Sequence, residues 1–312
     1  SGSSRFGLKR FVAELSRRPG RSRPRSSADM ALRAVVLAPL LASATVEIPT
    51  KRIAEHVNMP VISIGDGGQE TGHATAITSA WLSQGGRGID TAYMYGNQHQ
   101  VGKVIADSGI ARGELFITTK IPGCVDADIY VPKDLKELGL DYVDLLLIHG
   151  PAGGDCSATW AALERYHAQG VLKAIGVSNF ERSHLDALKK TMKVTPHVNQ
   201  IQLNVLEHDV DQIAASQELG INVEAYSPLG RSGQSGDIPG NPTIKAIAAA
   251  HNVSTYQVAI KWILQSGHLL TFQSSSPAHQ AADADVFHFE LTDSEMQELT
   301  ALQGRQSIFV WS

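Results

Sequence analysis

The chain is poor in cysteine and in charged residues, and it contains no long apolar segment. Cys124 and Cys156 are the only cysteines among 312 residues, and 19% of the residues are charged. Two cysteines are too few for a disulfide-stapled scaffold, so a reducing compartment is the default expectation and neither cysteine is assigned a role. The formal net charge of −4 gives no electrostatic reason to expect nucleic acid as a partner. With 43% hydrophobic residues, the composition is that of a globular protein with a buried core.

The sequence lacks the motifs of phosphoryl transfer and of zinc chemistry. It contains no Gly-Lys-Ser, no His-Glu-x-x-His and no Cys-x-x-Cys, so we expect no metal in the site. An open doubly wound sheet would carry the phosphate fingerprint G-x-G-x-x-G after its first strand. The nearest text begins at Gly65 and has Glu70 where the third glycine is needed. A carboxylate beside a pyrophosphate is repulsive, which disfavours that fold.

Residues 1–44 differ from the rest of the chain in charge. They hold nine Lys or Arg residues against two Asp or Glu residues, a net charge of +7. This Arg-rich, Ser-rich and acid-poor composition is typical of an organelle transit peptide, and the apolar run 34–44 resembles the core of a signal peptide. That run has eleven residues and contains Pro39, so it is too short for a bilayer, which takes about 20 residues. The alternative is upstream sequence translated in frame, with Met30 as the true start.

We therefore interpret residues 1–44 as a disordered N-terminal extension or targeting segment and residues 45–312 as the folded domain. The expected location is the cytoplasm, or an organelle if the extension directs the protein there.

From residue 57 onward, short apolar runs alternate with longer amphipathic segments. Segment 142–148, for example, is apolar along most of its length, which suits a strand buried on both faces. The predicted strands are Val61–Gly65, Gly88–Thr91, Leu115–Lys120, Val143–His149, Ala174–Ser178, His197–Leu203, Val223–Ser227 and Leu269–Ser274. The predicted helices lie near residues 73–84, 98–108, 133–139, 157–169, 181–192, 209–219, 242–251 and 254–266, with a further helix start at Thr292. Eight strands in regular βα alternation fit an α/β fold of the (β/α)₈ TIM-barrel type, in a single domain.

Polar residues stand at the ends of three consecutive predicted strands. Asp90, Lys120 and His149 each follow an apolar run, and Tyr95 lies on the loop after Asp90. In a barrel the carboxyl ends of the strands form the active-site rim, and neighbouring strands lie about 4.8 Å apart. We therefore expect these side chains to meet, although each one alone would be interpreted as a solvated or structural residue.

Such a set supports acid–base chemistry on a carbonyl oxygen. An ammonium close to a phenol stabilises the tyrosinate, so Lys120 is expected to lower the pKa of Tyr95. Asp90 supplies the counter-charge that a desolvated lysine needs, and His149 can hold a substrate oxygen by a hydrogen bond. A proton donor beside an oxygen-orienting imidazole is what carbonyl reduction needs, provided that a cofactor delivers a hydride.

The same residues occur in longer motifs that resemble those of the aldo-keto reductases. The motifs are Gly-Ile-Asp-Thr-Ala-Tyr-Met-Tyr-Gly-Asn at 88–97, Thr-Thr-Lys at 118–120, Leu-Leu-Leu-Ile-His-Gly-Pro at 145–151, Ile-Gly-Val-Ser-Asn-Phe at 175–180, Asn-Gln-Ile-Gln-Leu-Asn at 199–204 and Ala-Tyr-Ser-Pro-Leu-Gly at 225–230. The similarity extends from about residue 57 to residue 303, with the motifs in the family's order. The resemblance implies a barrel oxidoreductase that binds a nicotinamide cofactor across the strand ends without a Rossmann fold.

The resemblance also implies a role for each site residue. Tyr95 would be the acid–base residue, with Asp90, Lys120 and His149 completing a catalytic tetrad. The cofactor contacts would comprise Ser178, Asn179 and Gln200 at the carboxamide, Tyr226 stacked on the nicotinamide, Ser227 and Leu229 at the pyrophosphate, and Gln273, Ser274 and His279 at the adenosine end.

The sequence departs from the family at the cofactor's phosphate. Many relatives grip the 2′-phosphate of NADP with a Lys and an Arg, where this chain has Gln273 and His279. Two charge-assisted contacts worth roughly 1.5–3 kcal/mol each are lost, so NADP(H) stays favoured but NAD(H) becomes possible. Arg231 could compensate in part. Gly67 and Gly150 stand where aromatic residues often line the pocket, which predicts a wider pocket.

The leading hypothesis is a monomeric reductase of a small aldehyde or ketone, with neither a membrane nor nucleic acid as a partner. The alternative is a cofactor-binding regulatory or accessory protein with vestigial turnover. A barrel lyase or hydrolase would require paired carboxylates or a metal cluster at the strand ends, where Asp90 is the only acidic residue expected.

Overall fold

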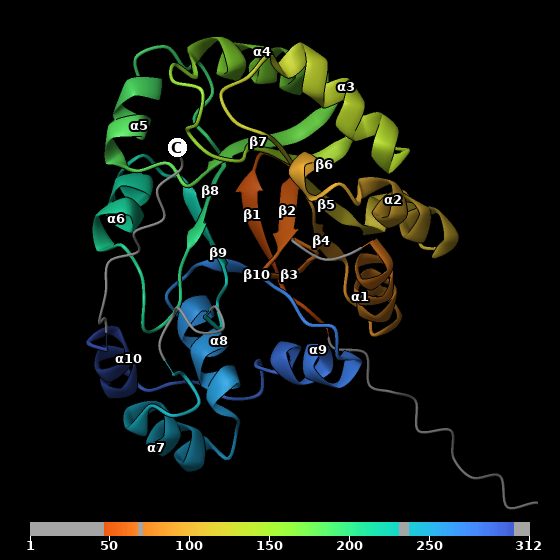
Figure 1. Ribbon diagram of the computed structural model, residues 1–312. Coiled ribbons are helices and arrows are strands. Elements are labelled where there is room, and N and C mark those ends of the chain that lie inside the picture. Colours follow the sequence, from red (N-terminus) through yellow and green to blue (C-terminus); the bar gives the residue numbers. More distant parts are fainter. Residues whose placement is uncertain (1–46, 68–70, 231–236, 303–312) are drawn as a thin grey trace, which may run out of the picture. The chain divides into compact units, whose positions relative to one another are not determined.

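Eight parallel strands close into a barrel, and helices surround it (Figure 1). The computed structural model describes residues 47–67, 71–230 and 237–302, which belong to one compact unit. The barrel strands are β3 (Ile62–Gly65), β4 (Gly88–Asp90), β5 (Phe116–Ile121), β6 (Val143–Ile148), β7 (Leu172–Ser178), β8 (Val198–Gln202), β9 (Asn222–Tyr226) and β10 (Leu269–Phe272). They pair in chain order, and β10 closes the ring between β9 and β3. The predicted (β/α)₈ fold is confirmed.

The strands are apolar on both faces because each face meets a different part of the core. Leu145 and Leu147 of β6 point into the barrel, where they pack with Phe116. Leu146 and Ile148 of the same strand belong to the outer cluster that includes the helices. Each such side chain is fully buried and contributes roughly 1.5–3 kcal/mol.

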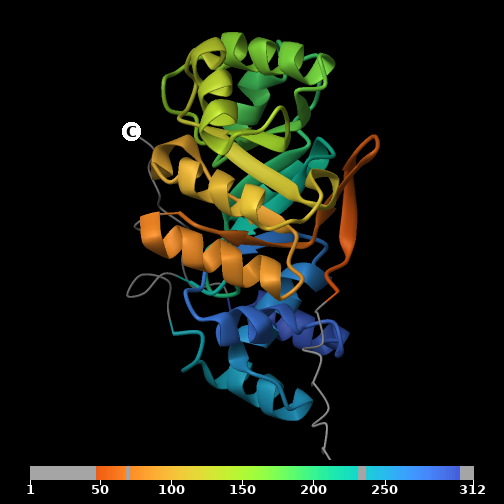
Figure 2. The ribbon, with the colours of Figure 1, turned by 90° about the vertical axis from the view of Figure 1, so that its right-hand side faces the viewer.

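A hairpin covers the amino-terminal end of the barrel. It consists of β1 (Thr50–Ala54) and β2 (Val57–Pro60), which pair antiparallel. Its apolar side chains Ile53 and Met59 pack against the lower barrel interior, and Figure 2 shows the hairpin to one side of the strands. Because this end is covered, the opposite end of the barrel remains for a site.

Most of the helices follow a barrel strand, and two of them follow another helix. They are α1 (Thr71–Ser83), α2 (Gln98–Asp107), α3 (Ala127–Leu138), α4 (Ser157–Ala168), α5 (Arg182–Leu188), α6 (Val210–Glu218), α7 (Pro242–His251), α8 (Thr255–Gln265), α9 (Pro277–Ala284) and α10 (Asp293–Thr300). Short 3₁₀ turns occur at Tyr93–Tyr95 and Arg112–Glu114. The predicted helix starts at Ser254 and Thr292 are confirmed as capping boxes.

Several elements were not predicted or were predicted with the wrong bounds; α5, for example, ends at Leu188 rather than near residue 192. The hairpin was not predicted, and neither was α9, which Ser276 caps and Pro277 begins. Helix α3 begins at Ala127 rather than near residue 133, because the Asp126 carboxylate accepts a hydrogen bond from the Asp128 amide at 3.0 Å.

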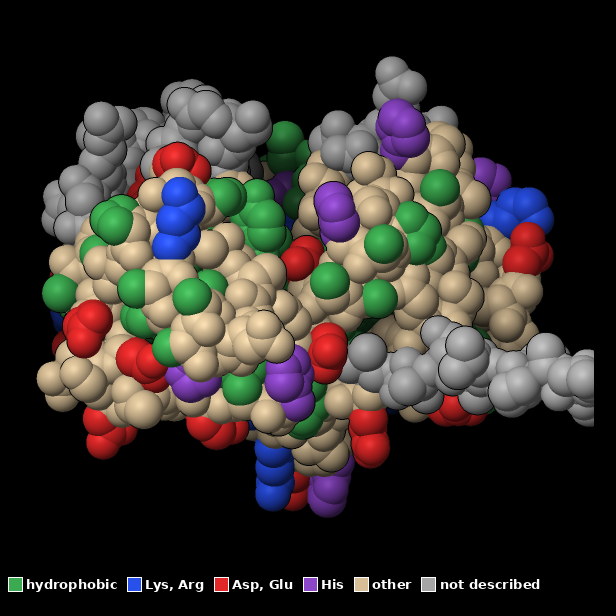
Figure 3. Space-filling model, turned by 90° about the horizontal axis from the view of Figure 1, so that it is seen from below, with side chains coloured by type: hydrophobic (Ala, Val, Ile, Leu, Met, Phe, Trp, Pro, Cys, Tyr) green, Lys and Arg blue, Asp and Glu red, His purple; other side chains and the backbone are tan. Residues whose placement is uncertain are grey.

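Some predictions fall outside the described residues, namely the extension 1–44 and Arg231. Among the described residues, no helix combines the length and apolar character needed to cross a membrane. On the face shown in Figure 3, acidic and basic side chains are scattered among neutral ones and no basic patch gathers.

Candidate active site

A cavity of about 640 Å³ opens at the carboxyl ends of the strands. Ten of the residues predicted for the site line it, and nine of them are Asp90, Tyr95, His149, Ser178, Asn179, Gln200, Tyr226, Ser227 and Leu229. Gln273 lines it as well, whereas Lys120 lies beneath it with no exposed surface. Strands β4 to β10 therefore bring residues far apart in the sequence to one mouth of the barrel, as the TIM-barrel prediction requires.

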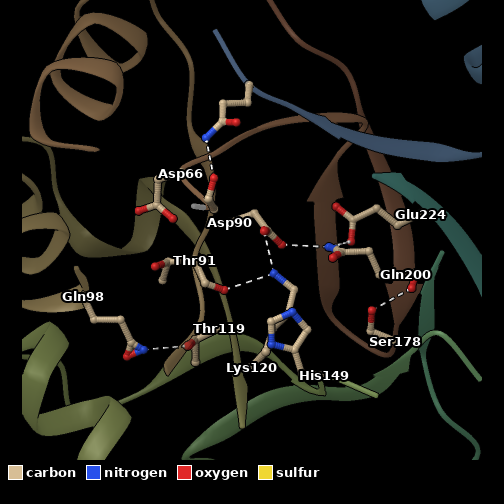
Figure 4. A network of polar contacts seen from close by, with 12 residues as sticks. Asp66, Asp90, Thr91, Gln98, Thr119, Lys120, His149, Ser178, Gln200 and Glu224 are labelled. Atoms are coloured by element: carbon tan, nitrogen blue, oxygen red, sulfur yellow. Dashed lines mark hydrogen bonds and ion pairs between the residues drawn. The ribbon is translucent and has the colours of Figure 1, made fainter. Parts of the chain in front are cut away.

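A buried ion pair lies at the bottom of the cavity. Lys120 Nζ is 2.6 Å from Asp90 Oδ1 and donates a second hydrogen bond to the carbonyl oxygen of Thr91 at 3.1 Å. Burial lowers the pKa of Lys120 and Asp90 raises it, and the balance holds the pKa above its ordinary value. Lys120 is therefore a permanent cation, and Figure 4 shows it at the centre of the polar network.

Tyr95 and His149 lie above this ion pair. Lys120 Nζ is 5.3 Å from the ring centre of Tyr95, and the rings of Tyr95 and His149 are 5.6 Å apart in an edge-to-face arrangement. Burial raises the pKa of Tyr95, although Lys120 acts to lower it. The predicted lowering of the Tyr95 pKa by Lys120 is present, but burial outweighs it, because sequence spacing does not reveal how strongly the protein desolvates the phenol.

His149 is an uncharged imidazole in this setting. It follows β6, and burial together with the charge of Lys120 lowers its pKa to about 3. A neutral imidazole can donate a hydrogen bond to a substrate oxygen without itself titrating near neutral pH. Its geometry and charge state thus suit the oxygen-orienting role expected from the sequence.

The predicted carboxamide contacts form one hydrogen-bonded group. The Asn179 side chain donates to Ser178 Oγ at 2.9 Å and to the His149 carbonyl oxygen at 3.0 Å. Tyr226 Oη donates to Asn179 Oδ1 at 2.9 Å, and Ser178 Oγ donates to the Gln200 carbonyl oxygen at 2.8 Å. Asn179 has a φ of 61°, a left-handed conformation that asparagine tolerates better than most residues. These bonds hold together one polar part of the cavity that Tyr95 also lines.

The structure separates the three residues predicted for the adenosine end. Gln273 follows β10 and donates to the carbonyl oxygen of Gly67, which comes after the neighbouring strand β3, at 2.9 Å. Ser274 and His279 are not part of the cavity lining and lie at the start of α9, where the Ser274 hydroxyl accepts from the Ser276 amide at 3.2 Å. A nicotinamide cofactor fits this arrangement, because amide and phenol side chains line a cavity that extends to Gln273 at the end of β10. The amino terminus of α9, where anions are favoured, follows next along the chain.

Two further carboxyl groups lie beside Asp90. Asp66 follows β3 and is 1% exposed, and burial followed by the charge of Asp90 raises its pKa to about 7. Glu224 lies in β9 and is fully buried. The expectation that Asp90 is the only acidic residue at the strand ends was therefore wrong. The available signal was a lone carboxyl within an apolar run, as in Val-Glu224-Ala.

The two cysteines, which the sequence left without a role, form a disulfide. Cys124 lies in the loop between β5 and α3, and Cys156 directly precedes α4. These are the loops that follow Lys120 and His149. The spacing of 32 residues gave no signal for the pairing. Disulfides persist in oxidising compartments and are rare in the cytosol, so this pairing goes against the expected reducing compartment. The cytoplasmic location stays a prediction.

The fold and the site define an oxidoreductase barrel. The model of the aldo/keto reductase family matches residues 62–303, and the chain belongs to that family. An aldo-keto reductase of Mycolicibacterium vanbaalenii is 42% identical over 261 residues, which are 82% of this chain and 92% of the relative. The glyoxal reductase of Bacillus subtilis is 38% identical over 267 residues, 83% of this chain and 94% of the relative.

Solved structures give the same result. An aldo/keto reductase from Brucella melitensis superposes with a TM-score of 0.78 at 34% identity, covering 83% of this chain and 99% of that one. An aldo-keto reductase of Bombyx mori in complex with NADP superposes with a TM-score of 0.76 at 29% identity, covering 83% and 94%. The resemblance found in the sequence motifs is confirmed.

Proposed function

We propose that the protein reduces an aldehyde or ketone to an alcohol, with Tyr95 as the proton donor. The observation that carries this proposal is the buried Lys120–Asp90 ion pair directly beneath Tyr95 and His149. A nicotinamide cofactor, when bound, supplies the hydride. Ser178, Asn179 and Gln200 would hold its carboxamide, and Tyr226 would pack against its ring.

The chain's own residues account for the proton. His149, neutral because of burial, donates a hydrogen bond to the substrate oxygen and orients it toward Tyr95. Tyr95 Oη transfers its proton to that oxygen as negative charge develops there. Lys120 stabilises the tyrosinate that remains, and Asp90 balances the lysine charge before and after the transfer.

Substitution of Tyr95 by Phe tests the proposal. We expect Tyr95→Phe to lose nearly all turnover of an aldehyde with NADPH, while quenching of tryptophan fluorescence shows that the cofactor still binds. Tyr93→Phe is a matched control on the same turn, because Tyr93 packs edge-to-face on Tyr130 with ring centres 4.9 Å apart. Full activity of Tyr95→Phe would overturn the assignment of the proton donor.

The cofactor preference follows from Gln273 and His279. The lost cations weaken recognition of the 2′-phosphate, so NADP(H) is favoured only modestly and NAD(H) is accepted. The NADP complex of the Bombyx mori relative supports the first choice. Parallel fluorescence titrations with NADPH and NADH measure the preference, and absence of binding to both would overturn the reductase proposal itself.

The proposed substrates are small carbonyl compounds. The proposed active form is a monomer. The name of the Bacillus subtilis relative makes glyoxal and other small aldehydes the first compounds to assay. Gly67 adds no side chain to the cavity wall, which suits a wide pocket. Light scattering in solution measures the oligomeric state.

A further inference from the structure

Glu224 is a buried carboxyl group to which the proposed reaction gives no task. It lies in the middle of β9, in register with Gln200 of β8, and it has no exposed surface. Burial, followed by the charge of Asp90, raises the pKa of Glu224. A buried carboxyl is unfavourable unless it is hydrogen-bonded, so Glu224 needs a hydrogen-bond partner at this position.

The partner is the side-chain amide of Gln200. Gln200 Nε2 donates one hydrogen bond to Asp90 Oδ2 at 2.7 Å and another to Glu224 Oε2 at 2.9 Å (Figure 4). An amide nitrogen has two hydrogens, and both are used by these two carboxyl groups. The carbonyl oxygen Oε1 of Gln200 is therefore the atom left for the cavity that this residue lines.

The two acceptors fix the amide more firmly than either would alone. With Asp90 as the only acceptor, one N–H would lack a partner and the amide could rotate about its last side-chain bond. With both present, a 180° rotation would place the amide oxygen against two carboxyl groups and forfeit both hydrogen bonds. The orientation of the amide thus depends on Glu224 as much as on Asp90.

We propose that Glu224 is a positioning residue that fixes the amide of Gln200, so that Oε1 of Gln200 accepts a hydrogen bond from the carboxamide N–H of the nicotinamide cofactor. The proposal rests on the proposed function, because it requires that the cavity bind such a cofactor. It assigns Glu224 no proton transfer and no contact with the substrate.

The test compares two cofactors that differ at one group. In 3-acetylpyridine analogues a methyl ketone replaces the carboxamide, so the N–H donor to Gln200 is missing. Dissociation constants are measured by tryptophan quenching for the wild type, Glu224→Met and Glu224→Gln, using NADP⁺ or NAD⁺, whichever the wild type binds more tightly, and its acetylpyridine analogue. Methionine is close to glutamate in size but cannot accept the bond, whereas glutamine can.

We expect Glu224→Met to weaken binding of the natural cofactor roughly tenfold, the worth of one hydrogen bond, and to leave the analogue within about twofold. Glu224→Gln should bind both ligands within about twofold of the wild type. Glu224→Asp, whose shorter side chain withdraws the acceptor but keeps the carboxyl, should repeat the loss of the methionine variant and serves in its place if that variant does not fold.

Equal weakening for both ligands would overturn the inference, because a purely structural role would affect them alike. Unchanged binding of the natural cofactor by both Glu224→Met and Glu224→Asp would overturn it as well. A wild type that binds neither natural cofactor would instead overturn the proposed function and the inference together, and that outcome is visible without any variant.

Discussion

Tyr95 is held against the backbone of Gly67. A Cβ atom at position 67 would lie 3.0 Å from Tyr95 Cζ and 3.2 Å from its hydroxyl oxygen. Contacts this short force a neighbour to move, and the phenol is the neighbour. The absence of a side chain at Gly67 therefore positions the proposed proton donor as well as widening the pocket.

Gly67→Ala should lower kcat by at least about tenfold, because a small displacement of the phenol disrupts the geometry of proton transfer. The affinity for NADPH should change by less than about threefold. Gly113→Ala is the control, since nothing lies within 4 Å of a Cβ atom there. Steady-state kinetics together with fluorescence titration measure both quantities, and an unchanged kcat would show that Tyr95 is not held by this contact.

Sequence spacing predicted those single residues of the site that stand at the ends of strands. Asp90, Lys120 and His149 follow apolar runs on consecutive strands, and the structure brings them together because parallel neighbours share an edge. Glu224 was not predicted, since the one available signal, a carboxyl inside an apolar strand, does not reveal its partner until the neighbouring Gln200 is known. The net direction of the Tyr95 pKa shift was not predicted for a related reason: desolvation is a property of the assembled fold, and here it outweighs the lowering by Lys120.

At the scale of elements, the period of the apolar residues predicted all eight barrel strands within about two residues at each end. The hairpin β1–β2 was not predicted because its strands are short and the buried Ile53 and Met59 stand among exposed or half-buried polar residues, which gives little periodic signal. Helix α9 is short and begins Pro-Ala-His, so its start depends on the Ser276 cap rather than on periodicity. Local capping and distant packing decide such elements, and neither is visible in a hydrophobic pattern.

The disulfide Cys124–Cys156 joins the loops after β5 and β6. In the chain-entropy model, closing a loop of this length stabilises the folded state by about 3–4 kcal/mol. We expect dithiothreitol to lower the melting temperature of the wild type by several degrees. The double variant Cys124→Ser/Cys156→Ser should melt at the lower temperature with or without the reductant. A wild type that does not respond to the reductant would show that the bond contributes nothing to stability.

Helices α2 and α3 meet at a buried carboxyl that weakens the fold as the pH rises. Asp134 is fully buried, accepts a hydrogen bond from Gln98 Nε2 at 3.0 Å, and has its pKa raised to about 8 by burial and then by Glu137. The folded state keeps this proton up to about pH 8, whereas the unfolded chain loses it above about pH 4. Between these values the folded state binds more protons, so the contribution of Asp134 to stability falls as the pH increases.

Asp134→Asn removes this dependence, because asparagine keeps an oxygen acceptor for Gln98 and has no proton to lose. Relative to the wild type, the variant should gain on the order of a few kcal/mol between pH 5 and pH 8. Urea unfolding at both pH values measures the gain, with the exposed Asp141→Asn as control. A difference between variant and wild type that does not change with pH would contradict the raised pKa.

At the scale of the whole molecule, the two ends of the barrel differ in role: the amino-terminal end is a packed core, and the carboxyl-terminal end holds the proposed site. The hairpin and the interior side chains around Leu145 and Leu147 fill the amino-terminal half. The carboxyl-terminal half holds the cavity and the Lys120–Asp90 ion pair. It also holds Asp66 and Glu224, two carboxyl groups whose pKa is raised. Charged and carboxyl groups of this kind are unfavourable to bury. A ligand that fills this cavity therefore binds where the barrel interior holds its buried polar and charged groups.

Cofactor binding should therefore raise the melting temperature. A ligand present at 100 times its dissociation constant and bound only by the folded state adds about 2.7 kcal/mol, which corresponds to roughly 5–10 °C for a domain of this size. NADPH should give the larger shift and NADH a smaller one at equal concentration. Tyr95→Phe should keep the shift, since the phenol serves the proton and not the cofactor, whereas Tyr226→Leu should reduce it by removing the ring at the nicotinamide. A shift lost in Tyr95→Phe but kept in Tyr226→Leu would reverse these two assignments, because thermal shift reports binding to the folded state irrespective of turnover.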